Sequence, residues 1–289
     1  MIALVFVLAL VGPAGAQSNA SSSDASPSNV AADAGGASTA APAQAGDDDR
    51  GLDLAEPDYF VVNLPTTLRL PRHSGNFRVT HRFGGNLRSG DFGDQASNLF
   101  GLDQGAVIGL EYRYAIVSHV QVAFTRSSFE KTIQFSGRYD AVHQSSAMPL
   151  SVSGLVSVEG PNNFQERFAP TLGLVVSREI QDRLAVYATP IWIHNSAAAI
   201  GVNRDTMMLG LGGRARLGSS AYVVAEVSPR LAGYAPGQVE YAFGVEKRVG
   251  AHVFQLTFAN TFGTTYGQVA RGGAPETLYL GFNLARKFF

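Results

Sequence analysis

Residues 75–83, Gly-Asn-Phe-Arg-Val-Thr-His-Arg-Phe, carry the pattern that decides the fold. The pattern repeats every two residues. One phase is apolar: Phe77, Val79 and Phe83. The other phase is polar: Arg78, Thr80 and Arg82. Because successive side chains of a β-strand point to opposite faces, this stretch predicts a strand with one apolar and one wet face.

The same alternation continues to the end of the chain. About twelve segments of about ten residues follow one another from Gly75, separated by turn residues, as in transmembrane barrels. Ten tilted residues match the thickness of a hydrocarbon layer, whereas the strands of soluble sandwiches are nearer five or six residues long. We therefore expect an all-β protein in which residues 75–289 form a closed antiparallel up-and-down transmembrane β-barrel of about 12 strands.

The connections between these segments alternate in length. Long connections are expected at 85–104, 194–205 and 262–275, and short ones at 115–118, 178–183, 217–220 and 249–251. Outer-membrane barrels have short periplasmic turns and longer external loops. This alternation predicts a bacterial outer-membrane location, with outer-membrane lipid around the barrel and the N-terminal tether on the periplasmic side.

Composition excludes several function classes. The formal net charge is -1 and 16% of the residues are charged, so there is no basic surface for nucleic acid. The chain has no cysteine, which excludes disulfides, thiolate metal sites, a thiol nucleophile and a lipoprotein anchor.

The N-terminal part of the chain has a different composition. Residues 1–16 hold an apolar run followed by Ala14-Gly15-Ala16, which predicts a cleaved signal peptide although no Lys or Arg precedes the run. Residues 17–58 are expected to be a disordered linker rich in Ser, Ala, Gly and Asp. Residues 59–74 are expected to be a short periplasmic lead-in segment. Its apolar patch, residues 59–64, is equally compatible with a strand, a plug or a docking peptide.

Energetics predicts which phase of the strands faces the lumen. An Arg at the lipid midplane costs roughly 2–4 kcal/mol, so the charged phase should point inward. His81, on the apolar phase, is an exception that the pattern does not explain. The predicted lumen-lining residues are Arg78, Arg82, Glu111, Arg113, Arg138, Arg214, Arg216, Glu226, Glu240 and Glu246.

The external loops offer few candidates for binding. We expect Asn98, Asp103, Arg126 and Glu130 in these loops, where binding residues often lie, although Arg126 and Glu130 also suit a structural turn. The histidines at 73, 81, 119, 143, 194 and 252 lack the short spacing of metal ligands, so neither a metal nor a cofactor is expected. One catalytic arrangement merits a test: His194 as a base near Ser127 or Ser128.

Four stretches in order resemble the bacterial β-barrel family called domain of unknown function 5777. They are 77–84 (FRVTHRFG), 98–103 (NLFGLD), 126–132 (RSSFEKT) and 252–260 (HVFQLTFAN). The resemblance covers about residues 65–289 and implies an outer-membrane-type barrel from a Gram-negative bacterium. It implies no catalytic or binding residues. The chain ends in an alternating strand with Phe288 and Phe289, which is similar to the C-terminal signal read by the barrel assembly machinery.

These observations favour a non-enzymatic, porin-like barrel: a narrow pore or a small-solute binding channel. The lumen of a small barrel can instead be filled by its own side chains, which would favour an anchor or interaction protein. A lipid hydrolase and a soluble periplasmic ligand-binding barrel are further alternatives. The solute or protein partner is not encoded in any motif.

Overall fold

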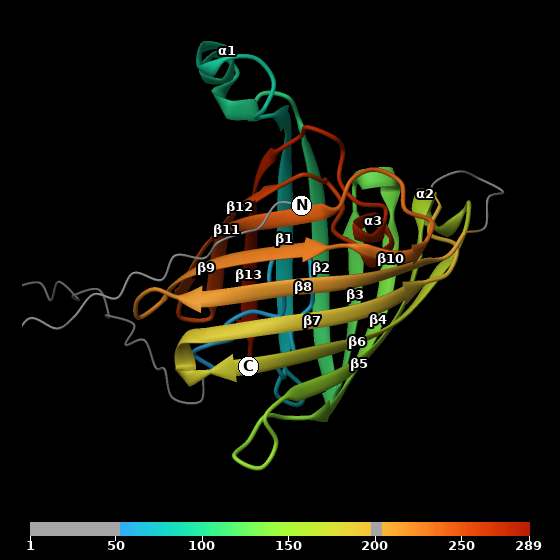
Figure 1. Cartoon of the computed structure of the whole chain (residues 1–289). Helices are drawn as coiled ribbons and strands as arrows, with labels where there is room; N and C mark the ends of the chain where they lie inside the picture. The colour runs from blue at the N-terminus through green and yellow to red at the C-terminus, as the bar shows by residue number, and fades with distance from the viewer. Residues whose placement is uncertain (1–52, 198–203) are drawn as a thin grey trace, which may run out of the picture. The chain divides into compact units, whose positions relative to one another are not determined.

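The computed structural model describes residues 53–197 and 204–289. The predicted signal peptide and most of the predicted linker lie outside these residues. The described chain forms one closed, antiparallel β-barrel (Figure 1). Its strands are β1 (Gly75–Asn86), β2 (Ala106–Val117), β3 (Val120–Ser127), β4 (Ile133–Val142), β5 (Ser151–Gly160), β6 (Ala169–Ile180), β7 (Leu184–Ile193), β8 (Thr206–Arg216), β9 (Ala221–Ser228), β10 (Arg230–Gly233), β11 (Glu240–Val249), β12 (His252–Ala259) and β13 (Tyr279–Phe288).

Every strand pairs antiparallel with its neighbours, and β1 pairs with both β2 and β13. The pairing of β8 with β9 closes the ring. β9 and β10 are two parts of one strand, because both pair with β8 and only Pro229, which has no N–H to donate, separates them; the register continues through Arg230 and shifts by one residue before Ala232. The predicted fold, a closed antiparallel barrel of about 12 strands, is confirmed.

The two ends of the barrel differ. At one end, called the loop end, long connections hold α1 (Phe92–Ser97), α2 (Pro161–Phe164) and α3 (Tyr266–Ala270), as Figure 1 shows. The turn end has short connections at 118–119, 181–183, 217–220 and 250–251 and one longer connection at 143–150. Among the described residues, no helix is long and apolar enough to cross a membrane.

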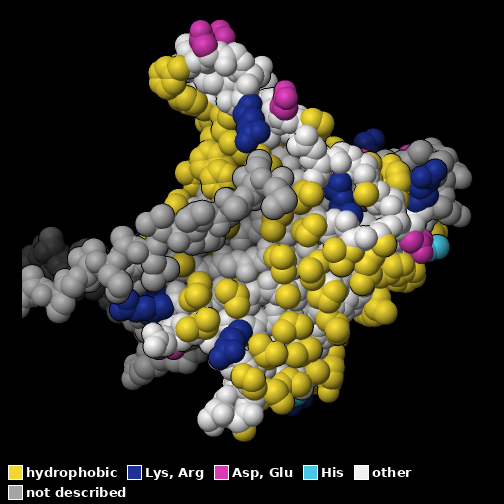
Figure 2. All heavy atoms as spheres, viewed as in Figure 1, with side chains coloured by type: hydrophobic (Ala, Val, Ile, Leu, Met, Phe, Trp, Pro, Cys, Tyr) yellow, Lys and Arg dark blue, Asp and Glu magenta, His cyan; other side chains and the backbone are white. Residues whose placement is uncertain are grey.

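The wall of the barrel has an apolar outer face and a polar inner face. On β2, Leu110 and Tyr112 are 42% and 48% exposed, whereas Glu111 and Arg113 between them are 8% and 3% exposed. Hydrophobic side chains cover much of the outer face in Figure 2. His81 also faces outward, where its ring stacks on that of Phe282 with centroids 4.9 Å apart.

Residues 53–74, which we call the plug, lie inside the barrel except for Pro71, Arg72 and His73, which are exposed at the turn end. They enter and leave at the turn end and reverse direction in a tight hairpin, in which Thr66 N–H donates to Tyr59 O and Val61 N–H to Leu64 O. Every residue from 55 to 68 is buried. Of the three interpretations of residues 59–64, the structure shows the plug. Residues 53–58, assigned to the linker from their composition, also lie in the lumen, where Asp53 accepts the Ala55 and Glu56 N–H groups.

Candidate functional site

The tip of the plug is bound by a single carboxylate of the wall. Glu226, on β9, accepts hydrogen bonds from three successive backbone N–H groups: Val62 at 2.9 Å, Asn63 at 2.7 Å and Leu64 at 3.0 Å. The carboxylate and its donors are buried. Charge-assisted bonds of this kind are stronger than bonds between neutral groups.

Cationic and amide side chains bind the carbonyl groups of the plug. Arg214 donates to Phe60 O at 2.7 Å, Gln255 donates to Val61 O at 2.6 Å, and Arg78 donates to Val62 O. Farther along the plug, Arg138 donates to Thr66 O and Leu68 O. The wall thus binds both the N–H and the C=O groups of the plug backbone.

One side chain of the plug tip also takes part. The Asn63 amide accepts a hydrogen bond from Arg82 at 3.1 Å and donates to Glu240 at 3.2 Å. It therefore bridges a guanidinium group of β1 and a carboxyl group of β11. All three side chains are buried, so the amide supplies hydrogen bonds to groups that burial has removed from bulk water.

Two aromatic rings of the plug contact cations of the wall. The Arg78 guanidinium lies 4.1 Å from the centroid of the Phe60 ring, and that of Arg113 lies 5.3 Å from it. The Lys287 ammonium lies 5.4 Å from the centroid of the Tyr59 ring. These cation–π contacts stabilise positive charge that burial has removed from water.

Charged side chains of the wall also pair with one another. Arg214 and Glu246 are 2.9 Å apart, Arg138 and Asp140 are 3.0 Å apart, and Arg113 and Glu111 are 2.9 Å apart. Each of these pairs is buried, so loss of one partner would leave an uncompensated charge.

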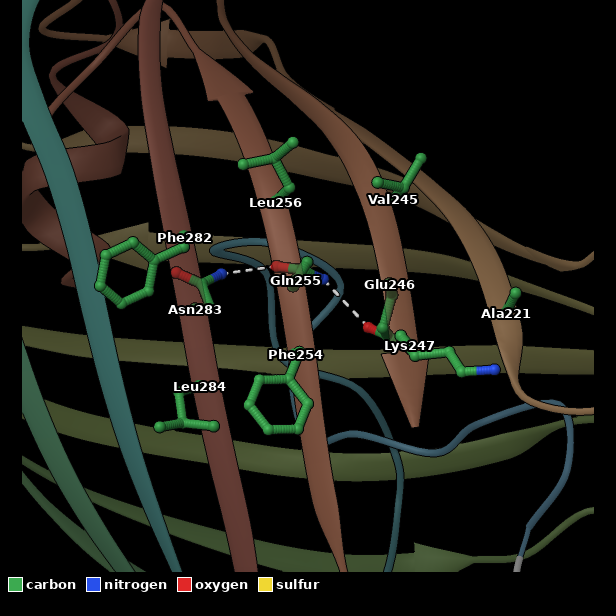
Figure 3. A pocket seen from close by; sticks show the side chains of 10 residues that line it. All are labelled: Ala221, Val245, Glu246, Lys247, Phe254, Gln255, Leu256, Phe282, Asn283 and Leu284. Atoms are coloured by element: carbon green, nitrogen blue, oxygen red, sulfur yellow. Dashed lines mark hydrogen bonds between the residues drawn. The ribbon is translucent and has the colours of Figure 1, made fainter. Parts of the chain in front are cut away.

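A hollow of about 590 Å³ lies beside β11, β12 and β13 (Figure 3). Its apolar lining, which includes Phe254, Leu256 and Phe282, belongs to the outward-facing phase of the strands. The inward-facing phase here is a hydrogen-bonded chain in which Asn283 donates to Gln255 and Gln255 donates to Glu246, drawn dashed in Figure 3. The hollow is therefore a lipid-facing feature that a polar row separates from the plug.

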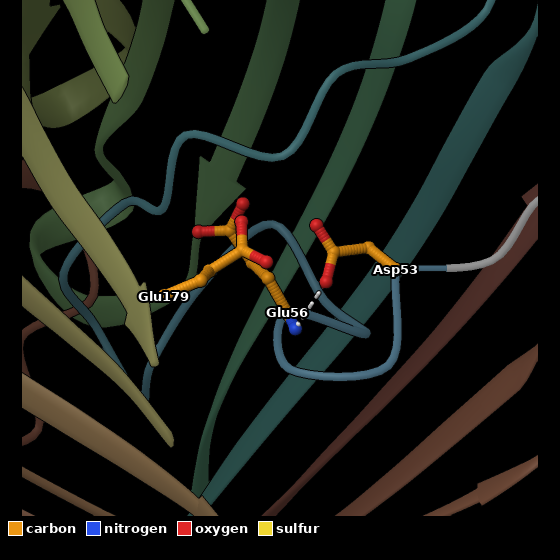
Figure 4. A group of neighbouring side chains, drawn as sticks. All are labelled: Asp53, Glu56 and Glu179. Atoms are coloured by element: carbon orange, nitrogen blue, oxygen red, sulfur yellow. Dashed lines mark hydrogen bonds between the residues drawn. The ribbon is translucent and has the colours of Figure 1, made fainter. Parts of the chain in front are cut away.

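Three carboxyl groups meet at the turn end of the plug: Asp53, Glu56 and Glu179 (Figure 4). Their oxygens lie within 4.8 Å of one another, and exposed acidic groups are common without an ion. Glu56 accepts the Thr67 N–H at 3.0 Å and is 1% exposed. Burial, with the nearby Asp53 charge as a second cause, raises the pKa of the Glu56 carboxyl to about 7. The predicted absence of a metal and a cofactor stays a prediction.

The loop end of the lumen is filled by the connection 260–278, which we call the inward loop. All five residues of its helix α3 are buried. Glu159 of β5 accepts the Gly267 N–H at 2.9 Å, and Gln268 donates to Phe129 O at 3.1 Å and to Thr132 at 3.0 Å. Apolar packing supplements these bonds, since Val269 and Ala270 belong to a buried cluster with Ile191 and Met208.

The structure places all the predicted lumen-lining residues except Arg216 in buried positions. Arg216 is half-buried at the turn end and donates to Ser219 O. The prediction omitted Gln121, Asp140, Gln255 and Asn283, which are buried on the same inner face. Their phase in the strands could have identified them, because they alternate with apolar residues just as the arginines do.

The predicted loop residues lie at the loop end but do not converge. Asn98 and Asp103 are exposed in the β1–β2 connection. Arg126 ends β3 and donates to Thr132 O across the turn, and Glu130 pairs with Arg271 of the inward loop at 2.6 Å. These two residues therefore have structural partners.

The structure does not show the predicted catalytic arrangement of His194 with Ser127 or Ser128. The partner of His194 is Asp205, 2.8 Å away. The hydroxyl of Ser127 accepts the Phe129 N–H within its own turn, and that of Ser128 accepts the Ile108 N–H of β2, so both hydroxyls bind backbone groups. Sequence reasoning did not predict Asp205 as the partner of the histidine.

Residues 58–288 match the family described as "Membrane bound beta barrel domain", domain of unknown function 5777. The chain belongs to this family. The match includes all the strands and most of the plug, and it confirms the resemblance seen in the four sequence stretches. A membrane-bound family also excludes the soluble periplasmic barrel.

Several solved structures are similar to this chain, all with TM-scores below 0.5. The NanC porin covers 74% of this chain with 98% of its own length, at 7% identity and a TM-score of 0.48. The KdgM porin covers 75% with 98% of its own length, at 8% identity and a TM-score of 0.45. The Acinetobacter baumannii outer membrane protein Omp33 covers 77% with 100% of its own length, at 9% identity and a TM-score of 0.42. Likeness at this level transfers no solute or partner. No curated protein matches the sequence.

Proposed function

We propose that the protein is an outer-membrane channel that its own plug closes at rest. The observation that carries this proposal is how the plug is bound: wall side chains hold its backbone, as Glu226 does at the tip. Among the described residues, the plug exchanges backbone hydrogen bonds with the wall only at His73 and Ser74, which bond Ala115 of β2 where the plug continues into β1. The ladder of backbone hydrogen bonds is complete without it, so the plug can leave while the wall stays folded.

The orientation and the assembly of the barrel are part of the same proposal. The turn end faces the periplasm, because short turns and the entry to the plug lie there, and the residues before the plug form a periplasmic tether. The C-terminal strand β13 pairs with β1 and presents Phe288 on the outer face. We assign Phe288 and Phe289 as the signal for the barrel assembly machinery.

A second candidate function is supported by the filled lumen. The plug occupies the barrel from the turn end and α3 from the loop end. A barrel that never opens would be a non-catalytic anchor or interaction protein. Whether the plug moves therefore distinguishes a channel from an anchor or interaction protein.

A reversible covalent lock tests whether the plug moves. Thr67 of the plug and Ser177 of β6 have hydroxyl oxygens 2.5 Å apart, and the chain has no cysteine of its own. The double variant Thr67→Cys/Ser177→Cys should therefore form one disulfide that joins plug and wall. Each single variant is a matched control that cannot form this bond within one chain.

Planar-bilayer conductance is the measurement, on protein shown to be folded by a heat-dependent gel shift. We expect no current from the oxidised double variant, and voltage-induced openings once it is reduced. Addition of Glu226→Gln, which weakens binding of the tip, should increase the openings of the reduced form. Absence of current from the folded, reduced Glu226→Gln protein would refute the channel and leave the anchor.

A further inference from the structure

We infer that the opened lumen accepts short zwitterionic peptides, and that the plug occupies the place of such a solute. This inference rests on the proposed channel function and names its solute class. It starts from the plug itself, an extended stretch of polypeptide that the lumen already binds.

The first argument is that the wall recognises peptide backbone. Glu226 binds three N–H groups, while Arg214, Gln255 and Arg78 bind carbonyl oxygens of successive residues. Every polypeptide offers these groups, whatever its side chains. A sugar can donate hydroxyl groups to a carboxylate, but it does not present the alternating N–H donors and C=O acceptors of a polypeptide backbone. The contacts therefore select for peptide rather than for one amino-acid sequence.

The second argument is that carboxyl and guanidinium groups bind the plug tip from different strands, with β12 and β13 between them in the wall. Glu226 and Glu240 come from β9 and β11, and Arg78 and Arg82 come from β1. The tip binds all four groups through Val62, Asn63 and Leu64. When the tip leaves, two carboxylates and two guanidinium groups lose partners together. A zwitterionic peptide can replace them, with its ammonium group on the carboxylates and its carboxylate on the guanidinium groups.

The remaining wall charges do not cancel this separation. Glu246 already pairs with Arg214, and Asp140 with Arg138, without the plug. Within the described residues, the hydrogen-bond partners of the buried Glu240 carboxyl are neutral groups, the Asn63 amide and the Ser228 hydroxyl. An ammonium group of a solute would supply a charged partner in place of the Asn63 amide.

Entry of a matched pair of probes into proteoliposomes tests the inference. The probes are trialanine, which is zwitterionic, and N-acetyl-trialanine amide, which has the same backbone without end charges. In the reduced Thr67→Cys/Ser177→Cys protein we expect trialanine to enter about tenfold faster than N-acetyl-trialanine amide. A tenfold ratio corresponds to a free-energy difference of roughly 1.4 kcal/mol. Glu226→Gln and Glu240→Gln should each bring the ratio toward one. Glu276→Gln, which removes an exposed loop carboxylate, should leave the ratio unchanged.

The outcomes distinguish this inference from the proposed function. Equal entry of the two probes after reduction, with none before, would overturn the peptide inference and keep the channel. No entry of either probe into vesicles with folded, reduced protein would refute both. Because two carboxylates are tested separately, a variant that fails to fold does not remove the test.

Discussion

The plug and the inward loop both fill the lumen, but they are held in different ways. The plug is attached to the wall covalently only where it continues into β1, and side chains of the wall bind its backbone. The inward loop is attached at both ends, to β12 and to β13, and it satisfies part of its own backbone, since Gln268 Oε1 accepts the Thr264 and Thr265 N–H groups and Thr265 O accepts the Val269 N–H. Two covalent attachments and internal hydrogen bonds suit a permanent part of the wall. A single covalent attachment, with hydrogen bonds supplied by side chains of the wall, suits a segment that can leave the lumen.

The largest expected effect on stability comes from removing the carboxylate that binds the plug, Glu226. The matched change removes the carboxylate that binds the inward loop, Glu159. Glu226→Ala leaves three buried N–H groups of the plug without an acceptor, at about 1–3 kcal/mol each, so the bound plug should lose more than about 3 kcal/mol. Glu159→Ala leaves only the Gly267 N–H without one and should cost the inward loop about 1–3 kcal/mol.

Hydrogen exchange measures both effects. Residues 60–66 should exchange much faster in Glu226→Ala, and residues 266–270 modestly faster in Glu159→Ala. Equal acceleration in the two segments would show that the plug is as permanent as the inward loop.

The second prediction concerns pH, which should act on the plug through its carboxyl group Glu56. Because the pKa of Glu56 is raised from 4.5 to about 7 when the plug is bound, the bound plug holds a proton more tightly than the released plug. Binding of the plug is therefore favoured most below pH 4.5, and that advantage, roughly 3 kcal/mol, is lost as the pH rises from 4.5 to about 7.

Protease cleavage of the plug across this pH range is the measurement. Cleavage should increase from pH 4.5 to 7 in the wild-type protein and change less in Glu56→Gln. The charged groups around Glu56 that shape this response are Asp53, Glu179, Arg138 and Arg214. Cleavage that decreases as the pH rises would contradict the prediction.

The third prediction uses the space around two glycines. A Cβ at position 210 would lie 2.5 Å from the end of the flexible Leu64 side chain, which can move, so Gly210→Ala should weaken plug binding by about 1 kcal/mol. A Cβ at position 267 would lie 2.3 Å from Glu159 Oε1, so Gly267→Ala should displace that carboxylate from its N–H donor. Conductance should rise in Gly210→Ala, whereas exchange at 266–270 should rise in Gly267→Ala. A rise in conductance in Gly267→Ala, or faster exchange at 266–270 in Gly210→Ala, would contradict the comparison.

The smallest effect is expected at the outer rim. The Arg271–Glu130 pair is partly exposed, and such pairs contribute about 0–1 kcal/mol. Arg271→Ala should thus lower the stability of the inward loop by less than about 1 kcal/mol and leave plug release unchanged. A loss of several kcal/mol in a denaturant titration would show that this pair is a main attachment of the loop.

Much of the site could be predicted, because lumen-facing residues follow from strand phase. Arg78 and Glu111 were placed by the cost of exposing charge to lipid, and both are buried. The partners of these charges could not be predicted. Glu226 binds residues more than 160 positions earlier in the chain, and no local pattern encodes a contact of that separation. His194 likewise binds Asp205 from the far side of a loop.

The sequence by itself determined the wall of this protein, and only the tertiary structure decided that the wall is plugged. Alternation along a strand is local: each residue's neighbours at one and two positions define its face, so the barrel can be inferred one segment at a time. Residues 59–64 have no such period, and their apolar side chains suit several environments. They lie in the lumen because the charged side chains that face it are buried away from bulk water. The backbone of these residues supplies the hydrogen bonds that those side chains require.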